Sequence, residues 1–99
     1  MNEVELLFQD KVVWMHTIPV FPKHTAIEFI DECRKHAIDI LGMDAFILEG
    51  DFHSPSMENS IDFTALPHSK NKPSNIWDAA IAFLKEREDI YYFEIVCEG

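Results

Sequence analysis

The sequence is poor in basic residues and in glycine, and each shortage argues against a class of function. Eight lysines and arginines stand against 18 aspartates and glutamates, so the formal net charge is -10. Such a charge repels nucleic acids and anionic membranes, because both present negative phosphates. The three glycines form no phosphate-binding loop, and no apolar run approaches the roughly 20 residues that a membrane-spanning helix needs. We therefore expect no nucleic-acid partner and no membrane partner.

Cysteine is also scarce, and its spacing argues against a metal or redox motif. Cys33 and Cys97 lie in separate apolar segments rather than in a C-x-x-C pair. Free buried thiols in a reducing cytoplasm are the favoured interpretation, although a disulfide between a helix and a terminal strand is geometrically possible. The first ten residues carry three carboxylates and no basic residue, which is the wrong charge for a secretory signal. We therefore expect a cytoplasmic protein.

The sequence is nevertheless rich in apolar residues, since 47% of its 99 residues are hydrophobic. A disordered acidic tail lacks such residues and cannot offset the entropy of ordering the chain. A chain of this length buries roughly 60–65% of its unfolded surface, which is enough for one domain without disulfides or metal. We expect a single domain over residues 1–99, with a β-hairpin-like extension at 1–22 and a core at 25–97.

The hydrophobic pattern predicts an α+β domain with the element order β-β-α-β-β-α-β. Residues typical of strands at 4–8 and 12–20 predict an N-terminal hairpin that turns at 9–11. Pro19 and Pro22 are expected to end this hairpin, because proline lacks the backbone donor that a strand needs.

Two helices are predicted from apolar residues at spacings of three and four. The first covers Thr25–Ala37 and opens with a capping box between Thr25 and Glu28. The second covers about 75–87. The predicted buried stripes comprise Ala26, Phe29, Ile30, Cys33 and Ala37 on the first helix, and Trp77, Ala80, Ile81 and Leu84 on the second.

Three further strands complete the predicted sheet, at 38–48, 61–65 and 90–97. Gly42 interrupts the first of them, and an isolated glycine in a strand marks a bulge or a close backbone approach. The last strand is apolar on both faces apart from Glu94, so it is predicted to be central. The result is a mainly antiparallel sheet of about five strands, with two helices packed on one face.

The serines and histidines form no motif for catalysis or metal binding. Cys33 and His36 lie three residues apart, but Cys33 belongs to a buried stripe and no second ligand pair exists at fixed spacing. Serines near His53 and His68 lie in polar connectors and lack the G-x-S-x-G elbow of a serine hydrolase. We therefore expect that the protein is not an enzyme and uses neither a cofactor nor a metal.

Carboxylates are concentrated in the third and fourth predicted strands and in the loop predicted between them at 49–59. They are Asp44, Glu49, Asp51, Glu58 and Asp62. If the two strands pair, several of these carboxylates converge at one end of the sheet and form a docking face for a basic protein. Phe52, or Trp14 if exposed, would add an apolar anchor, although Trp14 and Trp77 are more typical of a core. A solvated polar edge is the plain alternative.

Four short motifs carry a family resemblance. They are Ala26-Ile27-Glu28, Ile40-Leu41-Gly42-Met43-Asp44, Ala80-Ile81 and Glu88-Asp89-Ile90-Tyr91. Together they resemble the immunity proteins that act against the colicin that cleaves tRNA anticodons, and related immunity proteins of bacterial polymorphic-toxin systems. The likeness runs from about Thr25 to Val96. The segment 1–24 lies outside it, and Ala45-Phe46 stands where that inhibitor is glycine-rich.

The resemblance implies a non-catalytic inhibitor that occupies the RNA-binding cleft of a toxin nuclease, with carboxylates in place of phosphates. Only Gly42 and Asp44 carry over from the family's motif, and the other acids and Phe52 are nominated from charge and placement. The expected partner is a cognate basic toxin domain, and the oligomeric state is left open. An acidic adaptor or regulatory module without a toxin is the alternative. A small enzyme would need a pocket with a perturbed histidine or carboxylate.

Overall fold

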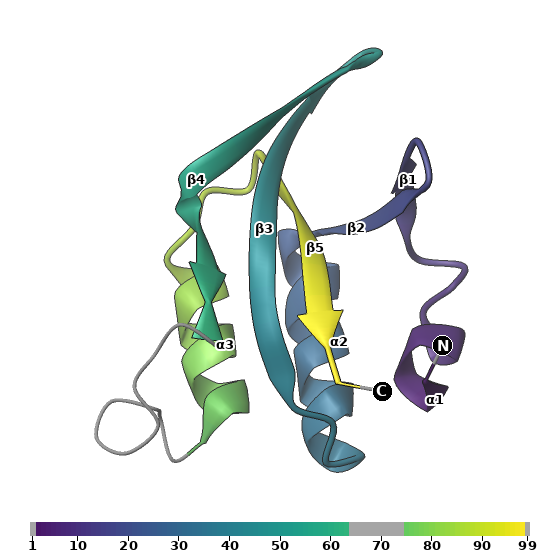
Figure 1. Cartoon of the computed structure of the whole chain (residues 1–99), viewed down its shortest axis with the longest axis vertical. Helices are drawn as coiled ribbons and strands as arrows, with labels where there is room; N and C mark the ends of the chain where they lie inside the picture. Colours follow the sequence, from purple (N-terminus) through teal and green to yellow (C-terminus); the bar gives the residue numbers. More distant parts are fainter. Residues whose placement is uncertain (1, 64–74, 99) are drawn as a thin grey trace.

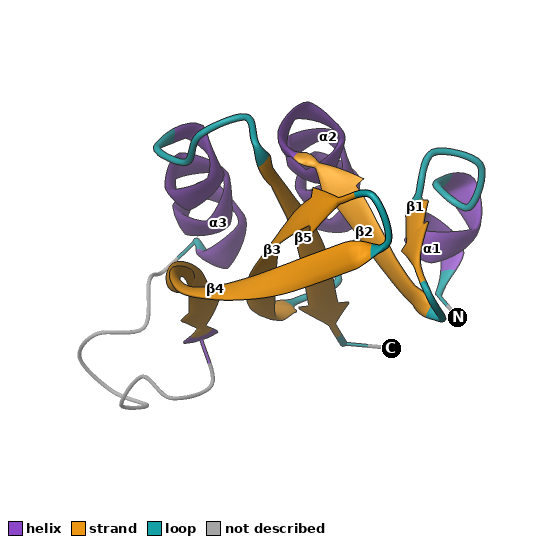
Figure 2. Ribbon diagram, turned by 90° about the horizontal axis from the view of Figure 1, so that it is seen from above, coloured by secondary structure: helices purple, strands orange, loops and turns teal. Residues whose placement is uncertain are grey.

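A computed structural model describes residues 2–63 and 75–98, which form a five-stranded antiparallel sheet with its helices on one face (Figures 1 and 2). The elements in chain order are α1 (Glu3–Leu7), β1 (Val13–Met15), β2 (Ile18–Pro22), α2 (Lys23–Lys35), β3 (Ile40–Glu49), β4 (Phe52–Asp62), α3 (Ile76–Lys85) and β5 (Tyr91–Cys97). The strand order is β1-β2-β5-β3-β4, so β5 is central as predicted. The predicted α+β class and strand number are confirmed.

The core lies between the sheet and the helices α2 and α3. Alternate residues of the two central strands, Met43, Ala45 and Phe93, are buried there. Phe29 and Ile30 of α2 meet them, both at 1% exposure or less. Full burial of a side chain of this size contributes about 1.5–3 kcal/mol. The apolar stripes of the helices therefore pack against one face of the sheet, and Figure 2 shows α2 and α3 together on that face.

The N-terminal segment differs from the prediction. Residues 4–7 lie in helix α1 rather than in a strand, and Phe8 caps its end, because Asn2 and Glu5 form a capping box with reciprocal 2.9 Å hydrogen bonds. The hairpin is formed by β1 and β2, and it turns at His16, whose φ is 57°. Pro19 lies within β2. This strand pairs with β5 only through its last two residues, Phe21 and Pro22, so the missing donor of Pro19 interrupts no hydrogen bond to β5.

Helix α2 begins two residues earlier than predicted, at Lys23, and no side chain among the described residues caps it. Thr25 is therefore inside the helix and buried, and the predicted capping box is absent. The stripe of Ala26, Phe29, Ile30 and Cys33 is buried as predicted. Ala37 is the exception: it lies beyond the helix and is exposed, with φ at 55°.

The loop predicted at 49–59 is mostly strand. β3 turns sharply at Gly50, whose φ is 58°, and the chain returns at once as β4. The two strands form a long hairpin whose tip rises above the rest of the sheet in Figure 1. The serine and proline content that favours a loop is tolerated, because β4 is the outermost strand and only one of its edges is paired.

The last helix agrees with the prediction, and the Asn75 side-chain oxygen caps it by accepting a 3.1 Å hydrogen bond from the Asp78 amide. Ala80 and Leu84 are fully buried, while Trp77 and Ile81 pack against the core with part of their surface exposed. The polar connector that contains His68 lies outside the described residues, as does the end of the strand predicted at 61–65.

Candidate functional site

Asp44 of β3 and Glu94 of β5 stand directly opposite each other in the sheet. Their neighbours Ala45 and Phe93 are buried in the core, and successive residues of a strand point to opposite faces. The two carboxylates therefore lie on the face away from α2 and α3. No helix of the described residues covers this face, and Asp44 is exposed there. We call it the open face.

The environment of this pair is electrostatically unfavourable. Burial raises the pKa of the Glu94 carboxyl, and the nearby negative charge of Asp44 raises it further. Like charges directly opposite each other on neighbouring strands destabilise a sheet. The open face therefore holds two carboxylates whose mutual repulsion a bound cation would relieve.

Asp62 adjoins this pair across Gly42. Gly42 is paired with Asp62 on β4 and with Val96 on β5. A Cβ atom at Gly42 would lie 2.9 Å from the Ile61 carbonyl oxygen, so only glycine allows the two strands this close an approach. The close backbone approach predicted at Gly42 is confirmed. A shallow hollow lies on the sheet at this point, and Asp44, Asp62 and Val96 line it together.

Apolar side chains surround the carboxylates on the same face. Phe46 is paired with Tyr92, two residues along each strand from Asp44 and Glu94, and Pro22 is paired with Tyr92 from the other side. Val96 is 43% exposed at the opposite end. An acidic centre with an apolar surround is the composition expected of a protein-binding surface, where aromatic contacts supply affinity and charges supply orientation.

The tip of the β3–β4 hairpin forms a second acidic group. Glu49 is paired with Phe52 across the turn that contains Asp51. Phe52 is 80% exposed. The tip also contacts the β1–β2 turn, because the rings of His53 and His16 are 5.1 Å apart between centroids. Since a strand rises about 3.4 Å per residue, Glu49 lies roughly 17 Å along β3 from Asp44.

Glu58 lies in a wide bulge of β4. Ser56 is opposite Ala45 and Ile61 is opposite Met43, so the four residues 57–60 stand against one residue of β3. The Ser60 hydroxyl holds this bulge by accepting a 2.9 Å hydrogen bond from the Ala45 amide and donating one of 2.7 Å to the Ser56 carbonyl. Such a bulge prevents another strand from pairing along this edge. It leaves Glu58 exposed at the margin of the sheet.

The structure thus divides the six predicted site residues instead of gathering them at one end of the sheet. Asp44 and Asp62 border the open face, Glu49, Asp51 and Phe52 form the hairpin tip, and Glu58 stands apart in the bulge. Sequence reasoning missed Glu94. A signal existed, because Glu94 is the one charged residue in a strand that is otherwise apolar.

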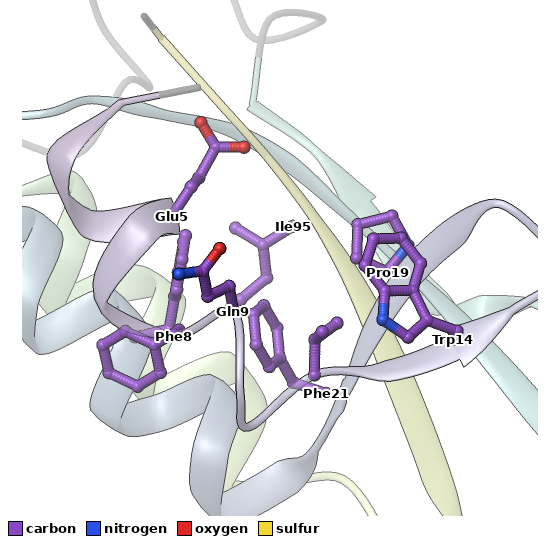
Figure 3. Close-up of a pocket in the computed structure, with 9 residues that line it drawn as sticks. Glu5, Phe8, Gln9, Trp14, Pro19, Phe21 and Ile95 are labelled. Carbon is purple, nitrogen blue, oxygen red and sulfur yellow. The ribbon is translucent and has the colours of Figure 1, made fainter.

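Trp14 is not a core residue, contrary to the expectation from its type. It is 58% exposed and pairs with Pro19 across the β1–β2 hairpin. Figure 3 shows the two rings at one end of a small apolar pocket whose other end carries Glu5. Trp77 packs against the core, and its indole nitrogen donates a 2.8 Å hydrogen bond to the Ile38 carbonyl.

Residues 2–63 and 75–98 contain no group of three or more histidine, cysteine, aspartate or glutamate side chains placed to hold a metal ion. Within the same ranges, no helix has the length and apolar character needed to cross a membrane.

Comparisons with known proteins give no match for this chain. Protein-family models, curated protein sequences and solved structures were all searched with the chain, and none of the three searches gives a match.

Proposed function

We propose that the protein is an immunity-type inhibitor that binds a basic toxin domain and blocks its substrate cleft, and that it is not an enzyme. The observation that carries the proposal is the Asp44–Glu94 pair on the open face. Two like charges at directly opposed positions cost stability in the free protein. Lysine or arginine side chains of a partner would remove that cost on binding.

The surroundings of the pair favour a protein partner over a small cation. Phe46, Tyr92 and Val96 give the carboxylates an apolar frame that can exclude water from a salt bridge. Desolvated charge pairs enclosed by apolar contacts are typical of strong protein interfaces. A toxin cleft that binds RNA is basic, so an acidic plug is complementary to it.

The hairpin tip gives the same interface a second point of attachment. Phe52 is almost fully exposed, and Asp51 and Glu49 flank it. An exposed aromatic side chain next to carboxylates can enter an apolar pocket while the acids meet basic residues at its rim. We place Asp44, Glu94 and Asp62 at the centre of the interface and the tip at its margin.

An acidic adaptor without a toxin would use the same open face, so the test must identify what is bound and what binding does. The tagged protein is used to capture partners from lysate of its source cells at low salt and at about 1 M salt, where the Debye length is only about 3 Å. The retained domain is then purified and assayed for nuclease activity and for toxicity when expressed alone. We expect one basic domain that persists in high salt and that loses its activity when the protein is added.

A matched pair of variants tests the location of the interface. D44N/E94Q neutralises the central carboxylates, and D10N/E88Q removes the same charge from exposed positions elsewhere. The first should weaken binding and inhibition tenfold or more, while the second should have little effect beyond a slower association rate. Equal losses in both variants would refute a specific site on the open face. A captured domain that is harmless would favour the adaptor.

A further inference from the structure

The two cysteines lie side by side on the helix-bearing face of the sheet, although 64 positions separate them in the sequence. Cys33 is on the buried stripe of α2 and has 0% exposure. Cys97 is the last residue of β5 and is partly exposed. Both are free thiols in one hydrophobic cluster, and the ionisation of each thiol is coupled chiefly to the other. Cys97 is therefore the more accessible of the two cysteines.

The Cys97 sulfur accepts a hydrogen bond from the Asn2 side-chain amide, whose Nδ2 atom lies 3.4 Å from Cys97 Sγ. Figure 1 shows how this contact arises, because the chain brings α1 beside the end of β5. Donors directed at a sulfur stabilise its thiolate form.

The ionisation of the pair follows from this arrangement. The neighbouring Cys33 thiol and, after it, the Asn2 amide lower the pKa of the Cys97 thiol to about 7, although burial and the Glu5 carboxylate act in the opposite direction. The neighbouring Cys97 thiol raises the pKa of Cys33, and burial raises it further. The arrangement thus favours the thiolate at Cys97 and the protonated thiol at Cys33.

We propose that Cys97 is a site of reversible oxidation by peroxides and that Cys33 is its resolving thiol, so that the two close an intramolecular disulfide. This inference concerns the opposite face of the sheet from the acidic site and does not depend on the proposed function. It requires a hydroperoxide as oxidant and a dithiol as the reductant that restores the pair.

The chemistry balances in two steps. The Cys97 thiolate attacks one oxygen of hydrogen peroxide, the O–O bond breaks, and the products are a Cys97 sulfenic acid and hydroxide, which takes a proton to become water. The Cys33 sulfur then attacks the Cys97 sulfur, the S–O bond breaks, and the hydroxyl leaves with the Cys33 proton as a second water. The two thiols lose two electrons in total, and one peroxide gains them.

The disulfide would change the contacts of α1. A thiolate is a stronger acceptor than a disulfide sulfur, so oxidation weakens the bond from the Asn2 amide. The same side chain caps α1, with its oxygen accepting from the Glu5 amide at 2.9 Å. Oxidation therefore links α2 covalently to β5 and loosens the hold of β5 on α1.

The test uses the full chain, reduced and then treated with one equivalent of hydrogen peroxide at pH 7. Samples are quenched with N-ethylmaleimide and examined by intact mass and by peptide mapping. We expect a monomer that has lost the mass of two hydrogens, takes up no maleimide, and yields a peptide that joins Cys33 to Cys97. A dithiol should reverse the change completely.

Three variants assign the roles of the two thiols. C33S should stop at the sulfenic acid of Cys97, which dimedone traps, and C97S should leave Cys33 unreactive while the protein is folded. N2A should slow oxidation of Cys97 several-fold at pH 7, because the amide that donates to its sulfur is lost. Wild-type protein that forms only intermolecular disulfides, or that gains oxygen at Cys97 without a link to Cys33, would overturn the proposal. An N2A variant that reacts at the wild-type rate would remove the assigned role of Asn2.

Discussion

Asp44 and Glu94 occupy directly opposed positions on the two central strands of the sheet, and both point away from the core. Central strands are where a sheet is held most firmly, so an unfavourable pair at this position cannot move apart to reduce its repulsion. The arrangement is costly for folding and useful for binding a cation, which is the compromise expected at functional surfaces. Stability and binding should therefore respond in opposite directions when this pair is changed.

The variant D44N should be more stable than the wild type. Asparagine keeps the size of the side chain and removes the repulsion of Glu94, so the free energy of unfolding should rise by about 0.2–1 kcal/mol. Urea unfolding at low ionic strength measures this, and the gain should shrink with added salt because the pair is partly screened. The same variant should bind the toxin domain less tightly. A loss of stability would show that Asp44 makes a favourable contact that outweighs the repulsion.

The raised pKa of Glu94 predicts a pH dependence of stability. Burial and the Asp44 charge favour the protonated form in the folded state, so the folded protein holds this proton to a higher pH than the unfolded chain does. The contribution to stability is complete below the unfolded pKa and is lost as the pH rises through the folded pKa. Unfolding between about pH 4 and 7 should show this decline in the wild type and a smaller one in E94Q. Identical profiles for the two proteins would exclude Glu94 as the source.

Sequence patterns predicted the parts of this fold that rest on periodic burial. The stripes of α2 and α3 repeat at helical spacing over several turns, and the central position of β5 follows from its apolar residues on both faces. The segment 4–8 was mistaken for a strand because its apolar residues suit either state. The capping contact between Asn2 and Glu5 favours a helix, and Asn2 lies outside the apolar run from which the strand is predicted.

The candidate site was harder to predict, because it depends on register. Asp44 and Asp62 were recognised from their charge, but nothing local to Glu94 shows which residue it faces. The bulge at 57–60 sets how far β4 extends beside β3, and its serine and asparagine residues are typical of a loop. The exposure of Trp14 likewise follows from the placement of the β1–β2 hairpin at the edge of the sheet, which its own sequence does not reveal.

Replacement of Gly42 by alanine should destabilise the protein. The added methyl group would lie 2.9 Å from the Ile61 carbonyl oxygen, a backbone atom that cannot move without shifting β4. Overpacking of this kind costs about 1–3 kcal/mol, which exceeds the roughly 0.4–1 kcal/mol gained from a less flexible unfolded chain. Thermal unfolding should show a lower melting temperature. Faster amide exchange should be confined to β3 and β4, and an unchanged melting temperature would contradict the close approach of these strands.

Phe52 should matter for binding and not for folding. Its side chain is 80% exposed at the hairpin tip, so F52A should change the free energy of unfolding by less than about 0.5 kcal/mol. If the tip anchors the toxin domain, the same change should weaken binding by about 1 kcal/mol or more, mainly through faster dissociation. M57A is the matched control, because Met57 is equally exposed at 81% but lies in the bulge of β4. Titration calorimetry and surface-binding kinetics with the captured domain would distinguish the two. Equal losses in F52A and M57A would move the interface from the hairpin tip to the outer edge of the sheet.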